Sequence, residues 1–502
     1  MTETKLPPIV RGEIQPWTDR DATGGPVLAA FLADLLPASA GRVLVAGPHD
    51  AGVLDVVAGR SDDVTVLLRS VSDAEALRGG AFSVVTGALD GLADEKPVPF
   101  DVVIAADGLD RLLGPDSPAL DWPERADLLR GLAAPDGLVV IGLANDFAIT
   151  ALLDRRPEKE RHGDDEWRPL HDDPRRPSSP AQVEALLGGV ARRYSLFATA
   201  GRVHTLLDSG ALSRTRAGLP GSGIALAGLA AVAGGTPLLA PVTDAAEAAA
   251  RAGMLDAVAP GWLIVLGQGG TTRTAYTPAG TADLEGGGWR FGDRLVPDVE
   301  SAETVLFRLA AAEDVPGFRA YAARLTGGAY FDAVHDFEKT PGDEVPLAAA
   351  WHRFRDRLIG GHRRHPWPPW MAEGDDLVKT WLAMSGIEPT AEILAHGREI
   401  AGPAPEPDDL RTVLADAETA RRTAEERAGH IFGLERTIGF RDRQLRTREQ
   451  QLRDMRAELR LLKSGRAVRM VSLVGRVARL RDPKRLAGAV KRRARRFLPG
   501  RS

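Results

Sequence analysis

A glycine-containing turn with the pattern of a ligand-binding loop lies in GRVLVAGPHDAGVLD, residues 41–55. Gly47 ends an apolar run, and Gly52 opens the next one shortly after His49. A residue without a side chain lets the main chain approach a ligand, which is why glycine recurs in the first turn of nucleotide-binding sheets. We therefore expect Gly47, His49 and Gly52 to contact a cofactor. An ordinary loop role is the alternative for His49.

An acidic residue follows a second apolar run, in FDVVIAADGLDRL, residues 100–112. Asp107 stands where this run ends, and Gly108 comes directly after it. In an open sheet of parallel strands, ligands bind beyond the carboxyl ends of the strands. The sequence therefore predicts that Asp107 and Gly108 lie across one crevice from Gly47 and contact the same cofactor.

Five apolar runs supply the strands that would position these residues. Each is rich in Val and Ile and is bounded by Gly, Asp or Pro, a pattern typical of strands buried on both faces. Helix-like segments separate the runs, beginning with residues 27–36, and this alternation predicts a parallel sheet with right-handed crossovers. A helix at 180–187 and a pair of strands within 194–207 follow. The five runs are residues 42–47, 64–68, 82–87, 100–107 and 137–143.

Residues 25–208 resemble the class I S-adenosylmethionine-dependent methyltransferases. GRVLVAG, FDVVIAADGLDRL and LAAPDGLVVIG resemble the family's first, fourth and fifth strands, and EWRPLHDDPRRP, residues 166–177, resembles the substrate-side loop of actinobacterial members. The resemblance implies a doubly wound Rossmann-like α/β fold over a first domain, residues 1–208. It also implies S-adenosylmethionine as cofactor and a small-molecule methyl acceptor. A saccharide acceptor is expected by analogy with multidomain polysaccharide enzymes and from the basic tail. Asp107, His162 and Glu166 are candidates for a base that deprotonates a hydroxyl acceptor, and a solvated loop position is the alternative for each.

Several positions that hold the cofactor in this family carry other residues here. Val45 stands where the family has an acid in the first strand, and the second glycine of the turn is missing between Gly47 and Gly52. Leu68 and Arg69 stand where the family has the acid that binds the ribose. Ala88 stands where the family has an acid near the adenine, and Asp90 is a candidate substitute for it. Charge-assisted hydrogen bonds are worth about 1.5–3 kcal/mol each, so losing two weakens binding by about a hundredfold or more. Three interpretations stay open: a working cofactor site, a degenerate scaffold, or a different small ligand in the same crevice.

Residues 209–402 are expected to form a second, α+β domain. GWLIVLGQGGTTRTAYTP, residues 261–278, has the pattern of a hairpin around a glycine-rich turn, and helical segments follow at 302–313, 318–325 and 347–361. The glycines at 267, 269 and 270 could mark the phosphate loop of a kinase-like domain. FDAVHDF, residues 331–337, faintly resembles the metal-binding stretch of such domains but lacks the Asn, and no Lys lies between residues 261 and 338. A degenerate kinase-like domain is therefore one interpretation of this region.

A linker, residues 403–409, leads into a heptad repeat over residues 410–463. The repeat predicts a coiled coil and a homodimer, expected to be parallel, with a single long helix packed on its own chain as the alternative. Arg427, Arg441 and Arg448 at d positions argue against a larger oligomer, because a wider core would desolvate them more. The a positions are Leu410, Ala417, Ala424, Ile431, Ile438, Leu445, Leu452 and Leu459, and the remaining d positions are Val413, Ala420, Leu434, Met455 and Leu462.

Charge is distributed unevenly along the 502 residues. Residues 466–502 contain thirteen Lys and Arg and one acidic residue, Asp482, so their charge is +12. Because the net charge of the whole chain is −5, the remaining residues carry −17. The basic tail, residues 464–502, has a partly amphipathic pattern that fits an anionic membrane surface. Nucleic acid is the weaker alternative, because binding to it would not explain the apolar side chains of Val471, Val474 and Phe497. With no Cys, the chain has no disulfides or thiolate metal sites, and no metal site is expected.

The leading hypothesis is a cytoplasmic S-adenosylmethionine-dependent methyltransferase that acts on a saccharide or cell-envelope precursor at the inner face of the membrane. One alternative is a non-catalytic scaffold of the same fold that assembles partners through its coiled coil and basic tail. The other is a nucleic-acid-binding protein that uses the tail. No signal peptide is expected, because a charged start followed by an apolar core is missing, and no run of about 20 strongly apolar residues predicts a membrane span.

Overall fold

The computed structural model describes residues 8–11, 18–19, 21–114, 117–157, 161, 173–214, 220–240, 242–325, 344–361, 363–372, 374–402 and 410–480. The chain divides into two compact units, residues 1–411 and residues 412–502.

One mixed sheet organises the first unit. Its 12 described strands follow the order β12-β11-β10-β9-β7-β6-β8-β5-β4-β1-β2-β3. The strands from β3 to β5 pair in parallel, as the sequence predicts, and the order around β1 and β4 is that of a doubly wound sheet. The strands are β1 (Arg42–Ala46), β2 (Asp63–Leu68), β3 (Ser83–Thr86), β4 (Phe100–Ala105), β5 (Ala133–Ala144), β6 (Val190–Thr199), β7 (Arg202–Asp208), β8 (Gly261–Leu266), β9 (Ala275–Thr277), β10 (Gly280–Glu285), β11 (Gly288–Phe291) and β12 (Arg294–Pro297).

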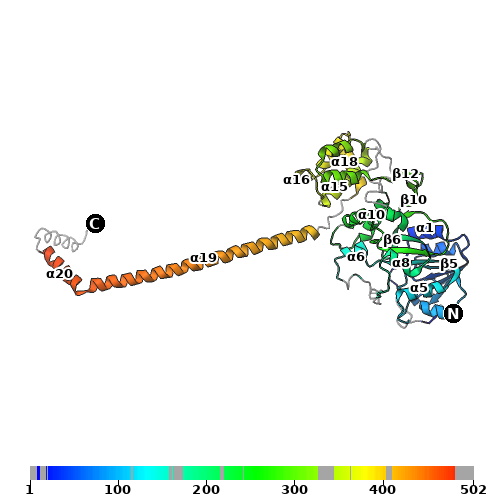
Figure 1. Cartoon of the computed structure of the whole chain (residues 1–502), viewed down its shortest axis with the longest axis horizontal. Coiled ribbons are helices and arrows are strands. Elements are labelled where there is room, and N and C mark those ends of the chain that lie inside the picture. The colour runs from blue at the N-terminus through cyan, green and yellow to red at the C-terminus, as the bar shows by residue number, and fades with distance from the viewer. Residues whose placement is uncertain are drawn as a thin grey trace, which may run out of the picture. The chain divides into compact units, whose positions relative to one another are not determined.

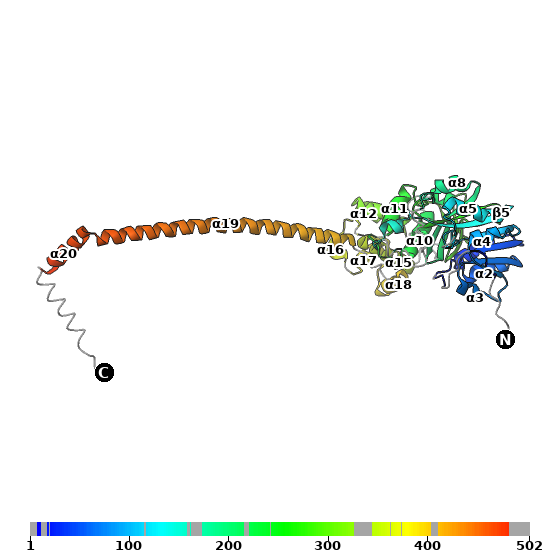
Figure 2. The same ribbon diagram turned by 90° about the horizontal axis from the view of Figure 1, so that it is seen from below.

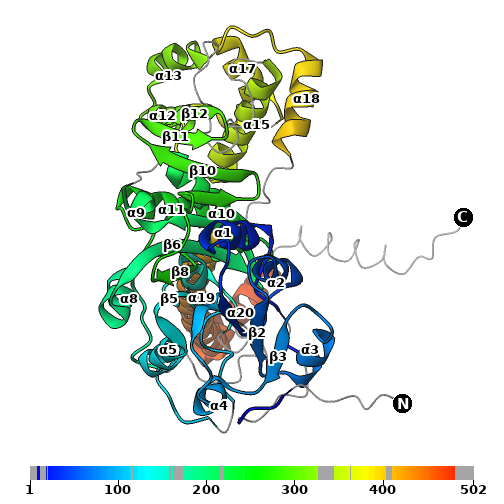
Figure 3. The ribbon, with the colours of Figure 1, turned by 90° about the vertical axis from the view of Figure 1, so that its right-hand side faces the viewer.

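Helices cover both faces of the parallel strands (Figure 3). Along β1, Val43 and Val45 pack in one core cluster, whereas Leu44 and Ala46 pack in another. The first face is covered by α1 (Pro26–Leu35), α2 (Ala51–Ala58) and α3 (Val71–Ala76), and the second by α4 (Leu89–Asp94), α5 (Trp122–Gly131) and α8 (Pro180–Leu187). Because alternate residues of β1 enter two cores, an apolar side chain is needed at every position of the run.

The strand that closes the parallel part of the sheet comes from beyond residue 208. β8 lies antiparallel between β5 and β6, so β6 runs parallel to β5. The expected hairpin over 261–278 is wrong, because β8 pairs with β5 and β6 while β9 pairs with β7 and β10. The sheet therefore crosses the boundary placed at 208. Over β6, β7 and the strands from β9 to β11 pack α6 (Ile149–Leu153), α9 (Ser209–Arg214), α10 (Pro220–Ala233) and α11 (Val242–Arg251).

The glycine-rich turn after β8 packs against the end of α1. The Gly270 amide donates to the Leu35 carbonyl at 2.6 Å. A Cβ on Gly270 would lie 2.2 Å from the Asp34 carbonyl oxygen, and one on Gly269 would lie 2.7 Å from a Leu35 methyl group. The glycines are needed for this close approach to another part of the chain. Because α1 fills the space beside them, a phosphate group could not bind there.

The described residues between 302 and 402 form a helical region with an aromatic core. Its described helices are α12 (Ala302–Ala311), α13 (Val315–Ala322), α15 (Glu344–Gly360), α16 (Pro369–Ala372), α17 (Asp376–Met384) and α18 (Ala391–Ala401). Arg357 bridges Glu247 of α11 and Glu303 of α12, and Arg363 reaches Glu247 at 2.9 Å. These ion pairs join the helical region to the helices over the sheet. The stretch 331–337, singled out for its faint kinase resemblance, lies outside the described residues.

Up to residue 480, where its description ends, the second unit is made of two helices, α19 (Leu410–Ser464) and α20 (Arg466–Leu480). Figures 1 and 2 show α19 as one continuous helix, after which the chain turns into α20. The a positions from Ile431 to Leu459 are each 49–58% exposed. No helix among the described residues combines the length and the apolar composition that a membrane span requires.

Candidate functional site

The sequence predicts the crevice at the edge where the neighbouring parallel strands β1 and β4 end. Gly47 has φ 91°, a conformation that favours glycine, and a Cβ there would lie 3.6 Å from the Cβ of Asp107. Gly108 has φ 100° and approaches the Gly142 carbonyl oxygen of β5. The structure therefore brings Gly47, Asp107 and Gly108 together, as the sequence predicts.

The turn after β1 is built to start a helix. Asp50 caps α2, because its carboxylate accepts from the Val53 amide at 2.9 Å and from the Gly25 amide at 2.7 Å. Gly52 lies in the first turn of α2, where it is exposed and an added Cβ would make one ordinary contact at 3.5 Å, to Asp50. Gly52 is therefore not required by a close approach, whereas the positive φ of Gly47 favours glycine there.

His49 occupies the second glycine position of the family pattern with a buried imidazole. Its Nδ1 lies 3.0 Å from the Gly47 carbonyl oxygen, and its Nε2 has no hydrogen-bond partner among the described residues. Burial lowers the pKa of His49 below its ordinary 6.5; nearby Asp107 opposes this effect and Arg111 adds to it. The ring is thus held neutral, inside the protein, at a position where a glycine would leave room for a ligand.

We expect His49 to make the folded chain less stable in mild acid. When a histidine has a lower pKa in the folded than in the unfolded state, its neutral form stabilises the fold. This stabilisation is fully present when the pH is above the unfolded-state pKa, and it is lost as the pH falls through the folded-state pKa. The free energy of unfolding should decline, by at most about 1.4 kcal/mol per pH unit for this residue, as pH falls from 6.5 to the lowered pKa of the folded state. Urea unfolding of the parent and of His49→Gln at several pH values measures the difference in slope. His352→Gln is a second test of the same effect, since burial also lowers the pKa of His352 and its removal should reduce the slope as well. Equal slopes in the parent and His49→Gln would contradict the expectation.

The chain's own N-terminal segment, meaning the described residues between 8 and 25, lies along the carboxyl ends of these strands. Thr86, at the end of β3, exchanges main-chain hydrogen bonds of 2.9 Å with residues 8 and 10. The Thr23 amide donates to the Pro48 carbonyl at 2.9 Å, and the Thr23 carbonyl accepts from the Asp50 amide at 3.0 Å. The segment is therefore bonded to the main chain on both sides of β2.

Asp107 is engaged by this segment and by its own loop. The Thr23 hydroxyl donates to the Asp107 carboxylate at 2.6 Å, and the Arg111 guanidinium donates to both carboxylate oxygens, at 2.8 Å through Nε. Arg111 also donates to the Asp21 carbonyl at 2.6 Å. Asp107 therefore holds the segment to the sheet, and its carboxylate is neither a poised base nor an open acceptor for a ligand's hydroxyl groups.

The ribose position of the family pattern carries a buried ion pair. Arg69 follows β2 and meets Asp19 at 2.6 Å, and the two side chains are 4% and 1% exposed. Asp90, the substitute for the acid near the adenine, pairs with Arg11 at 2.8 Å and accepts from the Ser117 hydroxyl at 2.7 Å. A Cβ on Gly91 would lie 1.8 Å from the Arg11 carbonyl oxygen, so the segment packs directly on α4.

The loop on the acceptor side is also closed by ion pairs where the structure describes it. Arg125, which is buried, pairs with Asp110 at 3.0 Å and with Asp173 at 2.9 Å. Arg176 reaches Asp110 at 3.2 Å and donates to the Ala144 carbonyl at the end of β5. His162 and Glu166, the other candidate bases, lie outside the described residues.

The residues at this edge do not fit S-adenosylmethionine. A nucleoside needs acceptors for its ribose hydroxyls and open space beside the turn, whereas this chain places the Arg69–Asp19 pair and the His49 ring there. The sequence predicted the crevice but not Asp19, Thr23 and Arg111, which fill it. The signal available in the sequence was the arginine at position 69, since a buried cation needs an acidic partner.

Known proteins resemble this chain only over part of its length. No protein-family model matches the sequence, and no curated protein sequence matches it. Among the solved structures that match, three are similar over about a quarter of this chain. Precorrin 8W decarboxylase from Methanobacterium thermoautotrophicum is 15% identical with a TM-score of 0.20, and the match covers 26% of this chain and 69% of that chain. The N-methyltransferase NodS from Bradyrhizobium japonicum, in complex with S-adenosyl-L-homocysteine, is 18% identical with a TM-score of 0.18, over 24% of this chain and 59% of that chain. The CcbJ methyltransferase from Streptomyces caelestis is 21% identical with a TM-score of 0.19, over 26% of this chain and 54% of that chain. The strand order and the antiparallel closure by β8 assign this chain a Rossmann-like, methyltransferase-like fold.

Proposed function

We propose that this chain is a non-catalytic assembly protein with a methyltransferase-like fold. The observation that carries the proposal is the occupation of the sheet's carboxyl edge by the chain's own groups. Arg69 is bound by Asp19, Asp107 by Thr23 and Arg111, and Asp90 by Arg11 and Ser117. A ligand would have to displace contacts that are already desolvated and paired, and displacing such contacts opposes binding.

Among the described residues, α19 exposes a row of large apolar side chains along one side. Its a positions carry Ile or Leu in five successive heptads, and each of these side chains is about half exposed in the single chain. A monomeric protein rarely exposes so long a row of large apolar side chains. A second copy of α19 presents the same row at the same spacing, which makes a homodimer the arrangement that buries it. This row, Ile431, Ile438, Leu445, Leu452 and Leu459, is called the seam below.

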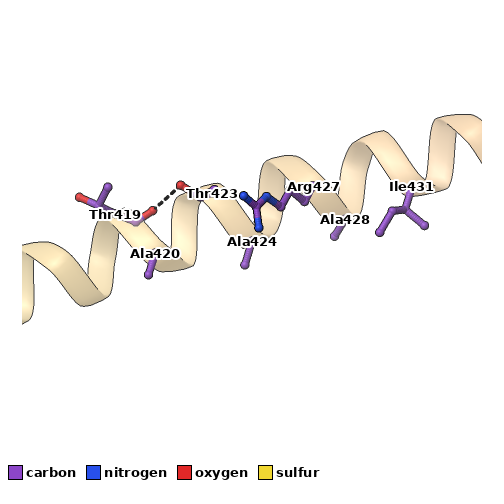
Figure 4. Close-up of a pocket in the computed structure, with 7 residues that line it drawn as sticks. All are labelled: Thr419, Ala420, Thr423, Ala424, Arg427, Ala428 and Ile431. Atoms are coloured by element: carbon purple, nitrogen blue, oxygen red, sulfur yellow. Dashed lines mark hydrogen bonds between the residues drawn. The ribbon is translucent and has the colours of Figure 1, made fainter.

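The N-terminal half of α19 carries small side chains along the same direction. Ala420, Ala424 and Ala428 point to the side of the helix on which Ile431 lies (Figure 4). Small side chains allow the backbones of two helices to approach closely. This stretch supports pairing with another helix, although it contributes less apolar area than the seam.

Methyl transfer is the alternative function, and the strand order favours it. It would act on a saccharide or another small-molecule acceptor and would require the N-terminal segment to leave the edge. Calorimetry of the full chain with S-adenosylmethionine and with S-adenosylhomocysteine separates the two functions. We expect no heat of binding for either compound up to millimolar concentration. Saturable binding of either one would overturn the non-catalytic proposal and favour a methyltransferase.

The assembly is tested by light scattering on the full chain. We expect a dimer for the parent, and we expect Ile438→Asp to weaken association by more than about a hundredfold, because a charged group would be buried twice in each dimer. Thr447→Asp, at a c position of the same helix, adds the same charge away from the seam and should leave the dimer intact. A monomeric parent, or equal losses in the two variants, would refute assembly through the seam.

A further inference from the structure

α20 partly separates basic from apolar side chains around its axis, with the exposed Leu473 lying between the two faces. At 100° per residue, Arg469, Ser472 and Arg476 fall on one side of the helix. The opposite side carries Met470, Val471, Val474 and Val477, which are 56–72% exposed. The helix contains four Arg and no acidic residue. This combination of an uncovered apolar face and a basic face requires a partner with both apolar and anionic chemistry.

The seam of α19 does not continue into α20. Counting the heptads onward from Leu459 places Arg469 and Arg476 at d positions. Val471 and Val474 fall at f and b, on the outer side of a dimer. Gly465 separates the two helices, and the chain changes direction there in both Figure 1 and Figure 2. A second copy paired along α19 would therefore leave the apolar face of α20 uncovered.

We propose that α20 binds an anionic lipid surface, lying in the plane of the interface with Met470, Val474 and Val477 inserted. Fifteen residues span about 22 Å at 1.5 Å per residue, too short to cross a bilayer, and the Arg residues remain at the level of the lipid phosphates. The sequence beyond α20 adds nine Lys and Arg. Each basic residue near such a surface strengthens binding by about fivefold, whereas the rest of the chain, at −17, is repelled. The proposal does not depend on whether α19 pairs.

The experiment is co-sedimentation of the full chain with vesicles of phosphatidylcholine alone or mixed with phosphatidylglycerol. Two variants add the same charge on opposite faces of α20: Val474→Asp on the apolar face and Ser472→Asp on the basic face. We expect binding to the anionic vesicles only. Val474→Asp should weaken it by more than about tenfold, since it loses both apolar burial and charge, whereas Ser472→Asp should weaken it by about fivefold or less.

Equal losses in the two variants would overturn insertion of the apolar face. Absence of binding by the parent, or equal binding to both kinds of vesicle, would overturn an anionic lipid partner. Tighter binding to duplex DNA than to the anionic vesicles at physiological salt would overturn it as well, in favour of nucleic acid. Circular dichroism of both variants checks that α20 remains helical, so that a lost helix is not mistaken for a lost contact.

Discussion

Arg69→Ala should detach the N-terminal segment from the sheet at a cost of about 3–5 kcal/mol, because breaking a buried ion pair leaves one partner inside without its counter-charge. Arg69 and Asp19 are nearly inaccessible to solvent and lie 2.6 Å apart. We expect the segment to open locally while the sheet stays folded, so that the loss of free energy falls on the segment. The amides of Val10, Thr23 and Gly24, which donate to main-chain carbonyls outside the segment, should exchange with solvent more than a hundredfold faster.

The control for this prediction is Arg308→Ala. Arg308 pairs with Glu300 at 2.9 Å on the surface, and exposed pairs of this kind contribute about 0–1 kcal/mol. The two variants lose the same charge and differ in burial. Hydrogen exchange followed by mass spectrometry reports the segment directly, and chemical unfolding reports the whole fold. An Arg69→Ala chain whose segment exchanges as slowly as the parent would show that the pair does not hold the segment.

Arg69→Ala also bears on the proposed function. If the N-terminal segment alone closes the edge, the variant exposes the turn at Gly47 while Arg69 no longer blocks the ribose position. We still expect no binding of S-adenosylmethionine, because the variant supplies no carboxylate for the ribose and His49 remains beside the turn. Binding by the variant but not by the parent would identify the segment as an autoinhibitory cover over a working site.

The parallel strands could be predicted because their signal is local. An apolar residue at each position from Val43 to Ala46 is what two cores on opposite faces of a strand require, and the structure places alternate residues in those two cores. The helices at 180–187 and 302–311 begin with Ser caps directly before them, a signal that also lies within a few residues.

The antiparallel closure could not be predicted in the same way. β8 pairs with β5 across more than a hundred residues of chain, and no local pattern specifies such a partner. A sign was nevertheless present in GWLIVL, residues 261–266, where all six residues are buried. A run without polar alternation is typical of a central strand, whereas the edge of a hairpin usually alternates. The glycines that follow this run suggested a hairpin turn, whereas in the structure they pack against the end of α1.

The site was predictable in its location but not in its contents. Gly47 and Asp107 meet because parallel strands place their carboxyl ends at one edge. The partners of Asp107 come from residues whose sequence context is unremarkable: Thr23 precedes α1, and Arg111 follows β4. Hydrogen bonds between distant side chains depend on the final geometry, which neither composition nor periodicity encodes.

Trp381→Ala should destabilise the helical region by about 3–5 kcal/mol, the usual cost of deleting a large aromatic side chain from a packed core. Trp381 is fully buried at the centre of that core. Its ring centroid lies 5.3 Å from Trp351, 5.2 Å from Phe354 and 5.1 Å from Trp367. Because four rings share one contact region, the deletion leaves a cavity that small side-chain shifts cannot fill.

Two further variants separate packing from other causes. Trp370→Ala makes the same change at a side chain that is 73% exposed and should cost less than about 0.5 kcal/mol. Trp381→Phe keeps most of the ring area and removes an indole N–H that has no hydrogen-bond partner among the described residues, so its cost should fall well below that of alanine.

Thermal and urea unfolding, followed by the near-ultraviolet signal of the tryptophans, measure all three variants. The ion pairs of Arg357 and Arg363 with Glu247 join this core to α11, so the loss should also lower the stability of the helices over the sheet. A Trp381→Ala chain as stable as Trp370→Ala would contradict the packing account. If only the helical region loses stability in Trp381→Ala, these partly buried ion pairs do not couple the two cores.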